Sequence, residues 1–367
     1  MTYSTKKTLF SSIKIGQHQL QHRVVLAPAS RLRATDSIPN EKLVEYYQQR
    51  SSEGGLLITE ATFISPLAGG YKHVPGIFTQ AQIDGWKKVT TAVHKKKSVI
   101  FLQLWHLGRV GSSKLNPNGD TIVSASAIRV PGKSPQLGGI EYETPHALEI
   151  SEIKSIVQDY RHAAINAIEA GFDGVEIHGA FGYLVDQFIN SSSNQRNDKY
   201  GGSIENRSRF ALELVDEIAD AIGVHRTAIR FSPGETFQDM HDETPVDTWS
   251  YLTSQLQSRH PDLAYVHFIE SRSNVHVEDQ TNTEDSLEPY RKIWKGPFIS
   301  SGGFSTAREH SIDLSEKTGN LIAFGRAFIA NPDLPHRLAH DLSLNKYDRS
   351  TFYTHEANGY IDYPFYE

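Results

Sequence analysis

The sequence predicts an α/β fold, specifically a TIM (β/α)8 barrel. Apolar, strand-like runs alternate with amphipathic helical stretches along most of the chain, and eight such strands can be counted. This alternation indicates a parallel sheet, and a count of eight favours a closed barrel over a doubly wound sheet. No linker or low-complexity tract divides the 367 residues, so we expect one domain over residues 1–367.

The elements follow in a regular order. A short hairpin around Gly16, within residues 9–20, is expected before the barrel. The eight strands are expected at residues 24–30, 56–64, 99–106, 174–178, 227–233, 263–270, 297–303 and 321–327. The intervening helices are expected at residues 40–52, 81–97, 151–170, 203–222, 247–259, 284–294 and 305–317.

Two connections are too long to be plain loops. Residues 107–148, rich in Gly, Pro, Ser and Asn, follow the third strand and are expected to form a lid or subdomain over the C-terminal mouth of the barrel. The polar stretch after the fourth strand is expected to re-enter a helix near Ser203, whose hydroxyl can cap the helix. Long loops after barrel strands are expected to bear functional residues.

Composition excludes several classes of function. The chain has 37 Lys and Arg against 43 Asp and Glu, and this net charge of −6 provides no basic surface for nucleic acid or anionic membrane. There is no cysteine, which rules out disulfides, thiolate metal sites and a cysteine nucleophile. No stretch of eighteen apolar residues occurs, and the N-terminus lacks the apolar core of a signal peptide. We therefore expect a cytoplasmic protein with no metal site.

Polar residues are predicted at the C-terminal ends of successive strands. In a barrel these ends face the active site, and they bear Ser30, Glu60, Gln103, His178 and Arg230. A barrel interior is ordinarily filled by branched aliphatic residues, so this set favours a catalytic site. The alternative is structural, since a single histidine on a strand can be a satisfied core residue and Glu60 can pair with a basic neighbour.

The last two strands end in glycines and one arginine. Gly302 and Gly303 follow the seventh strand, and Gly325 and Arg326 follow the eighth. Loops at these two positions commonly bind phosphate through backbone N–H groups and a guanidinium. Alternatively, the glycines only turn the chain and Arg326 packs its aliphatic stem. Neither a GxGxxG motif nor a P-loop lysine motif is present, so a bound phosphate would belong to another kind of carrier.

The chain resembles the Old Yellow Enzyme family of FMN-dependent ene reductases from about Lys7 to its C-terminus. The resemblance rests on HRVVLAPASR (22–31), ITEATFISPLAGGY (58–71), QLWHLGR (103–109), DQFINSSSNQRNDKYGGSIENRSRF (186–210), RFSPGETFQDM (230–240) and FGRAFIANPDL (324–334). It implies non-covalent FMN at the C-terminal mouth of a single FMN-binding barrel. It also implies NADPH or NADH as reductant and a small molecule with an activated alkene as substrate.

The resemblance also implies residue roles. The flavin ring would be lined by Pro28, Ala29, Ser30 and Ala61, with Gln103 on its pyrimidine edge, Arg230 at N1 and O2, and Gly302, Gly303, Gly325 and Arg326 on its phosphate. A cation at N1 and O2 stabilises the negative charge of reduced flavin. Tyr183 would donate a proton to the substrate, and His178 would hydrogen-bond its activating oxygen. The substrate pocket would comprise Tyr71, Trp105, His178, Phe181, Tyr183, Phe237 and Tyr353.

One position departs from the family pattern. In the family, two hydrogen-bond donors bind the substrate oxygen, in the pattern His-x-x-Asn or His-x-x-His. This chain has His178-Gly179-Ala180-Phe181 instead, so the second donor is missing. Losing one such donor commonly costs about 2.7–4 kcal/mol of transition-state stabilisation. Phe181 is either a filler in a pocket that obtains its second hydrogen bond elsewhere, or the mark of a specialised substrate held by one donor.

The expected function is reduction of an activated C=C bond in an enone, enal or related compound. Flavin-dependent isomerisation, or desaturation with oxygen as acceptor, is the alternative that Phe181 motivates. A flavin-binding protein without catalysis is a further possibility, as is a barrel glycosidase using Glu60 and Glu176 as its carboxylate pair. The sequence leaves open whether the protein is a monomer or a homodimer.

Overall fold

A closed barrel of eight parallel strands forms the centre of the molecule. The computed structural model describes residues 7–135, 137–271 and 284–367. In chain order the barrel strands are β3 (Val24–Leu26), β4 (Leu56–Ile58), β6 (Val99–Trp105), β11 (Gly174–Gly179), β12 (Thr227–Phe231), β13 (Tyr265–Ile269), β14 (Phe298–Ser301) and β15 (Leu321–Phe324). Each pairs with the next, and β15 pairs with β3, which closes the ring and confirms the predicted barrel.

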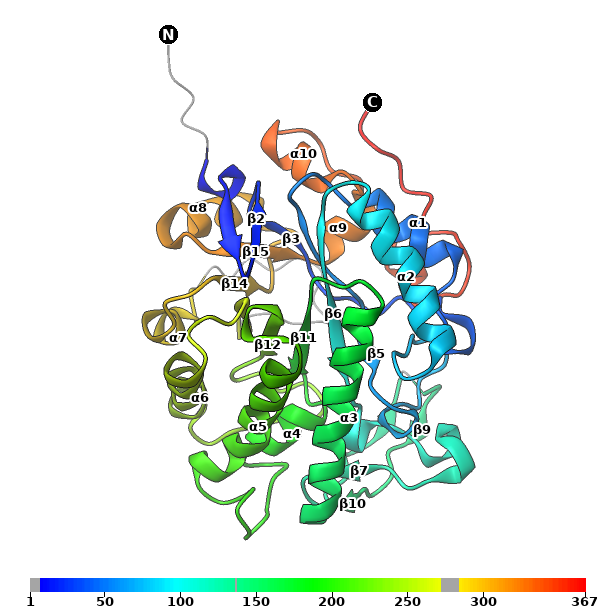
Figure 1. Ribbon diagram of the computed structural model, residues 1–367, viewed down its shortest axis with the longest axis vertical. Coiled ribbons are helices and arrows are strands. Elements are labelled where there is room, and N and C mark those ends of the chain that lie inside the picture. The colour runs from blue at the N-terminus through cyan, green and yellow to red at the C-terminus, as the bar shows by residue number, and fades with distance from the viewer. Residues whose placement is uncertain (1–6, 136, 272–283) are drawn as a thin grey trace.

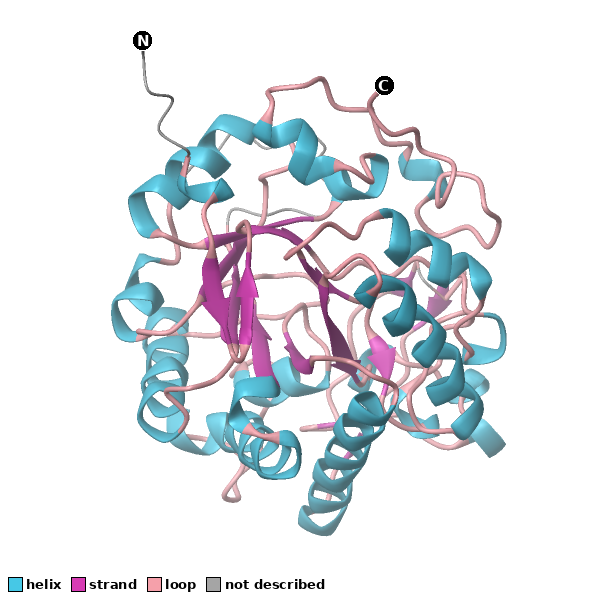
Figure 2. Cartoon of the chain, turned by 45° about the horizontal axis from the view of Figure 1, so that its top comes forward, coloured by secondary structure: helices cyan, strands magenta, loops and turns pink. Residues whose placement is uncertain are grey.

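Helices surround the strands (Figures 1 and 2). Those between successive barrel strands are α1 (Glu41–Gln49), α2 (Gln80–His94), α3 (Ile150–Glu169), α5 (Ile204–Ile222), α6 (Pro245–Arg259), α7 (Glu288–Ile293) and α8 (Arg308–Thr318). Three short helices were not predicted: α4 (Leu184–Ile189), α9 (Arg326–Ala330) and α10 (Leu334–Ala339). At five or six residues each, they are too short to show a helical period in the sequence.

Side-chain caps set several helix starts. The Ser203 side chain accepts a hydrogen bond from the Asn206 N–H, as predicted, and α5 begins directly after it. Thr79 and Gln82 form a capping box at the start of α2. The prediction that α3 opens at Ser151 was wrong by one residue, because Glu149 is the N-cap and forms a capping box with Glu152. Gly171 follows α3 with a left-handed φ of 88° and ends it.

The expected N-terminal hairpin covers the N-terminal end of the barrel. Its strands β1 (Ile13–Ile15) and β2 (His18–Leu20) are antiparallel. Ile15 and Leu20 are fully buried and pack in one cluster with inward residues of the barrel strands, among them Val25, Ile58 and Phe101. This cluster, the apolar plug, fills the barrel interior near its N-terminal end. Polar side chains are therefore found in the interior near the opposite, C-terminal end.

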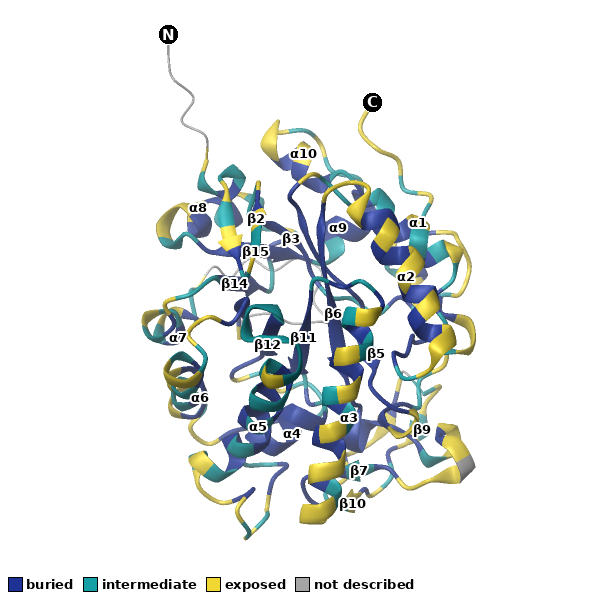
Figure 3. Ribbon diagram, in the orientation of Figure 1, coloured by how far each residue is buried: buried dark blue, intermediate teal, exposed yellow. Residues whose placement is uncertain are grey.

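A second and larger apolar core lies between the strands and the helices. Val175 and Ile177 of β11 belong to it, together with inward residues of α2, α3 and α5. Figure 3 shows the strands almost wholly buried and the exposed residues in stripes along the outer faces of α2 and α3. The alternation predicted for β11 is thus confirmed, because Glu176 and His178 lie on the other face of the strand, inside the barrel.

The excursion over residues 107–148 contains two small sheets. β7 (Val123–Ser124) pairs with β10 (His146–Ala147) in parallel, and β8 (Lys133–Ser134) pairs with β9 (Ile140–Glu141) in antiparallel fashion. A further short strand, β5 (Thr62–Phe63), extends the barrel sheet beside β6. Short 3-10 turns lie at Thr8–Phe10, Thr35–Ser37, Pro66–Ala68, Gly108–Val110, Ser113–Leu115, Pro117–Gly119, Val224–Arg226 and Arg349–Thr351.

Hydrogen bonds connect this excursion to α4, the short helix that follows β11. Ser124 Oγ donates to Gln187 Oε1 over 2.9 Å, and the Arg109 N–H donates to the same oxygen over 3.1 Å. The excursion therefore packs on the C-terminal mouth, which supports the expected lid or subdomain. In the part of the chain that the structure describes, no helix has the length and apolarity needed to cross a membrane.

Candidate active site

The predicted polar residues meet at the C-terminal end of the barrel because the strands are parallel and in register. His178 pairs in register with Arg230, and Arg230 with His267 on β13. Glu176 pairs with Gln103 on β6. Residues opposite one another in parallel strands point to the same face. These five side chains therefore form one buried polar layer above the apolar plug.

A chain of hydrogen bonds joins most of this layer. Gln103 Nε2 donates to Glu176 Oε1 over 2.7 Å. The other carboxylate oxygen of Glu176 lies 2.9 Å from His267 Nδ1, and His267 Nε2 lies 3.0 Å from Ser301 Oγ. Glu176 and His267 have no exposed side-chain surface. His267 and Ser301 were not predicted as site residues, although alternation along β13 places His267 on the inward face.

Arg230 is the cation of this layer. Its side chain is buried, and its terminal nitrogen lies 3.5 Å from Ser301 Oγ. Burial lowers the pKa of Arg230 from 12.5 to about 10, while the charge of Glu176 opposes that shift. The guanidinium is therefore charged at neutral pH. Its Nε has no hydrogen-bond partner among the described residues, so one donor remains available for a bound group.

Aromatic rings gather above the polar layer. The His178 ring is 6.1 Å from that of Trp105 and stacked on it, and both meet the ring of Tyr183 edge-on, at 4.9 and 4.7 Å. Tyr71 meets Trp105 edge-on at 5.8 Å. The structure thus brings together four of the predicted substrate residues, from the loop after β5 and from β6, β11 and the loop after β11.

The two predicted catalytic residues have opposite pKa shifts. Burial, followed by the charge of Arg230, holds the pKa of His178 well below its usual 6.5, so the imidazole is neutral. Burial raises the pKa of Tyr183 above 10, so its phenol keeps its proton at neutral pH. The Nδ1 of His178 has no hydrogen-bond partner among the described residues. The pair therefore offers a neutral hydrogen-bonding ring beside a protonated hydroxyl.

Side chains of α4 hydrogen-bond to the backbone of the loop that carries Tyr183. Asp186 Oδ2 accepts from the Gly182 N–H over 2.8 Å, and Gln187 Nε2 donates to the Gly182 carbonyl over 2.7 Å. Gln187 also donates to the carbonyl of Leu107. Both side chains are buried. Sequence reasoning missed these supports, because one buried Asp–Gln pair in a six-residue helix leaves no periodic signal.

Phe181 has an unusual backbone conformation. Its φ is 56°, in the left-handed region, where non-glycine residues are uncommon and Asn, Asp and His are enriched. Its N–H donates to Ser232 Oγ over 2.8 Å, which holds the turn. Its ring packs edge-on against Phe237 at 6.3 Å and over the Arg230 guanidinium at 5.4 Å. Phe181 and Phe237 thus lie together beside the cation of the polar layer.

The glycines at the ends of β14 and β15 form an open backbone surface. Gly302 and Gly303 both have positive φ, 106° and 74°, which only glycine adopts without strain. A Cβ placed on Gly325 would meet no atom of the described residues within 4 Å. Arg326 directly follows and is half-buried. Neighbouring strands thus end in three half-buried glycines and an arginine on one side of the mouth.

The remaining predicted residues also lie at this end of the barrel. Pro28, Ala29 and Ser30 are half-buried in the loop after β3, and Ala61 is buried just after β4. Three strands were predicted clearly too long. β3 ends at Leu26, because Pro28 has no N–H to continue the ladder, β4 ends at Ile58, and β15 ends at Phe324, since α9 begins at Arg326. Tyr353 is 63% exposed and lies close enough to Tyr183 to influence its pKa, so it lies near the rim of the pocket.

Glu60 does not face a partner carboxylate in these contacts. One oxygen accepts from the Arg31 N–H over 3.2 Å. Burial raises the pKa of Glu60 from 4.5 to about 7. Both oxygens of Glu176, in turn, have partners inside the barrel. The arrangement gives no support to the alternative of a glycosidase carboxylate pair.

These residues fit both the ring and the phosphate of a flavin. The buried cation Arg230 has a donor atom without a partner among the described residues, and the Gln103 amide belongs to the same polar layer through Glu176. Two glycines with positive φ and the open space at Gly325 leave backbone accessible, as close approach to a phosphate requires. Among the described residues, no group of three or more His, Asp or Glu side chains is arranged to hold a metal ion.

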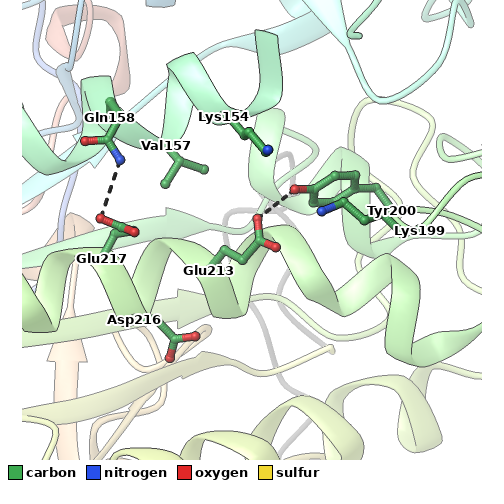
Figure 4. A pocket seen from close by; sticks show the side chains of 8 residues that line it. All are labelled: Lys154, Val157, Gln158, Lys199, Tyr200, Glu213, Asp216 and Glu217. Atoms are coloured by element: carbon green, nitrogen blue, oxygen red, sulfur yellow. Dashed lines mark hydrogen bonds between the residues drawn. The ribbon is translucent and has the colours of Figure 1, made fainter. Parts of the chain in front are cut away.

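A separate hollow lies on the outer wall. It measures about 420 Å³ and is bordered by residues of α3 and α5 together with Lys199 and Tyr200. Figure 4 shows Tyr200 donating to Glu213 of α5, over 2.8 Å, and Gln158 of α3 facing Glu217. None of the residues of the polar layer borders it, so it is distinct from the barrel mouth.

Comparison with known proteins agrees with this geometry. The sequence profile described as "NADH:flavin oxidoreductase / NADH oxidase family" matches residues 8–345. The chain is 47% identical over 360 residues to 12-oxophytodienoate reductase 1 of Oryza sativa subsp. japonica, covering 98% of this chain and 93% of that one. It is 45% identical over 389 residues to flavin oxidoreductase hxnT of Emericella nidulans, covering 99% and 98%.

Solved structures give the same result. Morphinone reductase superimposes with a TM-score of 0.90 at 41% identity, covering 100% of this chain and 98% of the other. Its complex with tetrahydroNAD gives a TM-score of 0.88 at 42% identity, with 98% of each chain covered.

A barrel mouth that combines a buried cation, an amide and an aromatic pocket defines a flavin-dependent oxidoreductase. The chain belongs to the NADH:flavin oxidoreductase / NADH oxidase family, the Old Yellow Enzyme family that its motifs resemble. It is an ene reductase with FMN as cofactor and NAD(P)H as reductant, and it acts on a small-molecule substrate.

Proposed function

We propose that this enzyme reduces a conjugated enone or enal, with His178 binding the carbonyl oxygen and Tyr183 supplying the proton. The observation that carries the proposal is the contact of the Tyr183 and His178 rings, 4.9 Å apart, beside Trp105 at the barrel mouth. A carbonyl bound by His178 would place its conjugated double bond within reach of the Tyr183 hydroxyl. The relatives named for reduction of 12-oxophytodienoate and morphinone support this substrate class.

The proposed cofactor contacts follow the polar layer and the glycines. Bound FMN, once reduced by NADH or NADPH, would supply the hydride that the substrate β-carbon accepts. Arg230 would stabilise negative charge on the reduced ring, and the Gln103 amide would bind its pyrimidine edge. Ser30 would donate to the ring, with Pro28, Ala29 and Ala61 lining it. Gly302, Gly303, Gly325 and Arg326 would hold the phosphate.

Each catalytic side chain has one task in this scheme. His178, neutral because burial lowers its pKa, donates a hydrogen bond without placing a full charge on the oxygen. Tyr183, whose pKa burial raises, retains the proton that the substrate α-carbon needs. Tyr71 and Trp105 pack around the reacting carbons and exclude water.

Phe181 is proposed to narrow the substrate range. In place of a second donor, its apolar ring packs between Phe237 and Arg230. A flat substrate with an apolar surface next to its carbonyl would therefore bind best, while a small enone that depends on two donors would react slowly. Tyr353 would contact the outer end of such a substrate at the rim.

The two half-reactions test the proposal. Purified yellow enzyme, reduced anaerobically by NADH or NADPH, should be reoxidised by a panel of enones, and the product should gain two hydrogens in mass. Unchanged product mass would point to isomerisation instead. A bound flavin that no enone or enal reoxidises would disprove the proposed substrate class.

We also propose a cytoplasmic enzyme, monomeric or homodimeric, with neither nucleic acid nor a membrane as partner. The net charge of −6 offers no attraction to polyanions, and NAD(P)H is available in the cytoplasm. Cell fractionation tests the location and the absence of a membrane partner, and size-exclusion chromatography tests the oligomeric state.

A further inference from the structure

Glu176 is a buried carboxylate that the proposed chemistry does not use. It lies inside the barrel with no exposed side-chain surface, between the Gln103 amide and the His267 ring. A buried carboxylate is costly unless its charge is balanced and its oxygens accept hydrogen bonds. Its presence within β11, two residues before His178, therefore requires an explanation beyond packing.

The hydrogen-bond partners of Glu176 fix the orientation of Gln103. A carboxylate only accepts, so the Gln103 amide must turn its Nε2 toward Glu176, at 2.7 Å. The Oε1 of Gln103 is then directed away from Glu176. An amide held in this way presents a defined acceptor, which is what the N3–H donor on the pyrimidine edge of a flavin requires.

Glu176 also determines which atoms donate and which accept in the hydrogen bonds of His267 and Ser301. Burial lowers the pKa of His267 from 6.5 to about 4, so this ring is neutral and has a single N–H. That hydrogen lies on Nδ1, which faces Glu176 at 2.9 Å, and Nε2 then accepts from Ser301 Oγ at 3.0 Å. Ser301 Oγ in turn lies 3.5 Å from the Arg230 guanidinium.

The charge of Glu176 also acts on Arg230. Because His267 is neutral, Arg230 is the cation in this layer that balances the carboxylate, and the Glu176 charge raises the pKa of Arg230 against the effect of burial. A negative charge near Arg230 must reduce the positive potential that the guanidinium presents at the barrel mouth. Glu176 is therefore placed to weaken the preference for reduced, anionic flavin.

We propose that Glu176 is a positioning residue that orients Gln103 and partly offsets the charge of Arg230, and so sets the reduction potential of the bound flavin. The inference rests on the proposed contacts of Gln103 and Arg230 with the flavin ring. Without Glu176, the full charge of Arg230 would act on the flavin and make it easier to reduce.

Sulfite binding tests this inference without turnover. Sulfite adds reversibly to oxidised flavin, the adduct is anionic, and a positive charge near the ring strengthens it. Glu176→Gln holoenzyme should bind sulfite on the order of tenfold more tightly than wild type, as expected for one buried charge acting over several ångströms. The midpoint potential of its flavin should rise in parallel.

Three further variants complete the test. Glu213→Gln removes one carboxylate from the outer hollow of Figure 4, where Glu213 accepts from Tyr200, and should leave sulfite affinity within about twofold of wild type. Arg230→Leu should weaken sulfite binding. Glu176→Gln combined with Arg230→Leu removes both buried charges together, and this neutral interior should fold even if Glu176→Gln alone does not. It should bind sulfite more tightly than Arg230→Leu alone.

The outcomes separate this inference from the proposed function. If Glu176→Gln and the double variant each bind sulfite no more tightly than their parents, Glu176 has no electrostatic role and the inference is wrong. If Arg230→Leu leaves sulfite affinity and flavin affinity unchanged, the proposed contact of Arg230 with the flavin is wrong instead. If Glu213→Gln gains as much sulfite affinity as Glu176→Gln, the gain comes from the net charge of the protein, and the inference is wrong.

Discussion

The guanidinium carbon of Arg230 lies 5.4 Å from the centre of the Phe181 ring. The cation proposed to face the flavin thus has on one side Phe181, the residue that we expect at the position of the family's second substrate donor. Phe181 occupies this place with a φ of 56°, a conformation that costs an ordinary residue roughly 1–2 kcal/mol. A strained backbone retained at a pocket wall indicates a functional constraint on that position.

Replacing Phe181 by asparagine should restore the second donor. A hydrogen bond to a charged oxygen is worth about 1.5–3 kcal/mol, so a phenolate inhibitor such as ionised p-hydroxybenzaldehyde should bind roughly ten- to a hundredfold more tightly. Titration of the long-wavelength charge-transfer band measures this. Asparagine tolerates the left-handed conformation, so the thermal midpoint of the holoenzyme should not fall.

Phe181→Leu is the matched control, since it adds no donor and keeps an apolar side chain. Its phenolate affinity should not rise. Equal gains in the leucine and asparagine variants would show that ring size, rather than the missing donor, limits binding.

Replacing Tyr183 by phenylalanine should slow only the oxidative half-reaction. The ring contacts with Trp105 and His178 persist, but the proton is lost, which typically costs on the order of a hundredfold or more. Anaerobic stopped-flow with a reduced enzyme and an enone measures the effect. Reduction of the flavin by NAD(P)H serves as the internal control and should stay within about threefold of wild type. Unimpaired enone reduction would assign proton donation to another group or to water.

Binding of a non-ionising ketone should be independent of pH between about 5.5 and 8.5. Burial together with the charge of Arg230 holds the pKa of His178 well below 6.5, so the ring does not titrate in this range. Perturbation of the flavin absorbance by the ketone gives the dissociation constant at each pH. A step near 6.5 that disappears in His178→Asn would contradict this prediction.

Glu60 should make the protein less stable as the pH rises. Its pKa is raised from 4.5 to about 7 by burial, so the folded protein binds this proton more tightly than the unfolded chain does. The stabilising contribution is complete below pH 4.5 and is lost as the pH rises through about 7. At about 1.4 kcal/mol per pKa unit, the upper limit is roughly 3 kcal/mol.

Thermal midpoints of wild type and Glu60→Gln at pH 5 and pH 8 measure this contribution. The variant, which cannot ionise here, should lose less stability between the two pH values than wild type does. Burial also raises the pKa of Asp186, from 3.8 to about 7. Asp186 therefore lowers the stability of both proteins equally as the pH rises, and its contribution cancels in the comparison. An identical slope in the two proteins would show that Glu60 does not titrate in this range.

Local patterns in the sequence were sufficient for the barrel and for most strand-end residues. Alternation along β11 placed Glu176 and His178 on the inward face of the strand. The same alternation along β6 and β12 placed Gln103 and Arg230 on the inward face as well. The short helix α4, the Asp186 and Gln187 supports and the role of His267 were missed. Alternation along β13 indicates that His267 faces inward, but its partners Glu176 and Ser301, like the Leu107 and Ser124 partners of Gln187, are distant in the chain, and a single sequence contains no signal for such pairs.

The sequence by itself determined the fold class, the family and the identity of the polar residues at the barrel mouth, because these depend on periodicity and on motifs that are local in the chain. Only the tertiary structure decided how those residues act on one another. The orientation of the Gln103 amide, the neutral state of His267 and the packing of Phe181 over Arg230 all follow from burial and from contacts between distant strands. Hydrogen-bond direction and desolvation are properties of the assembled site, so they arise only when the barrel closes.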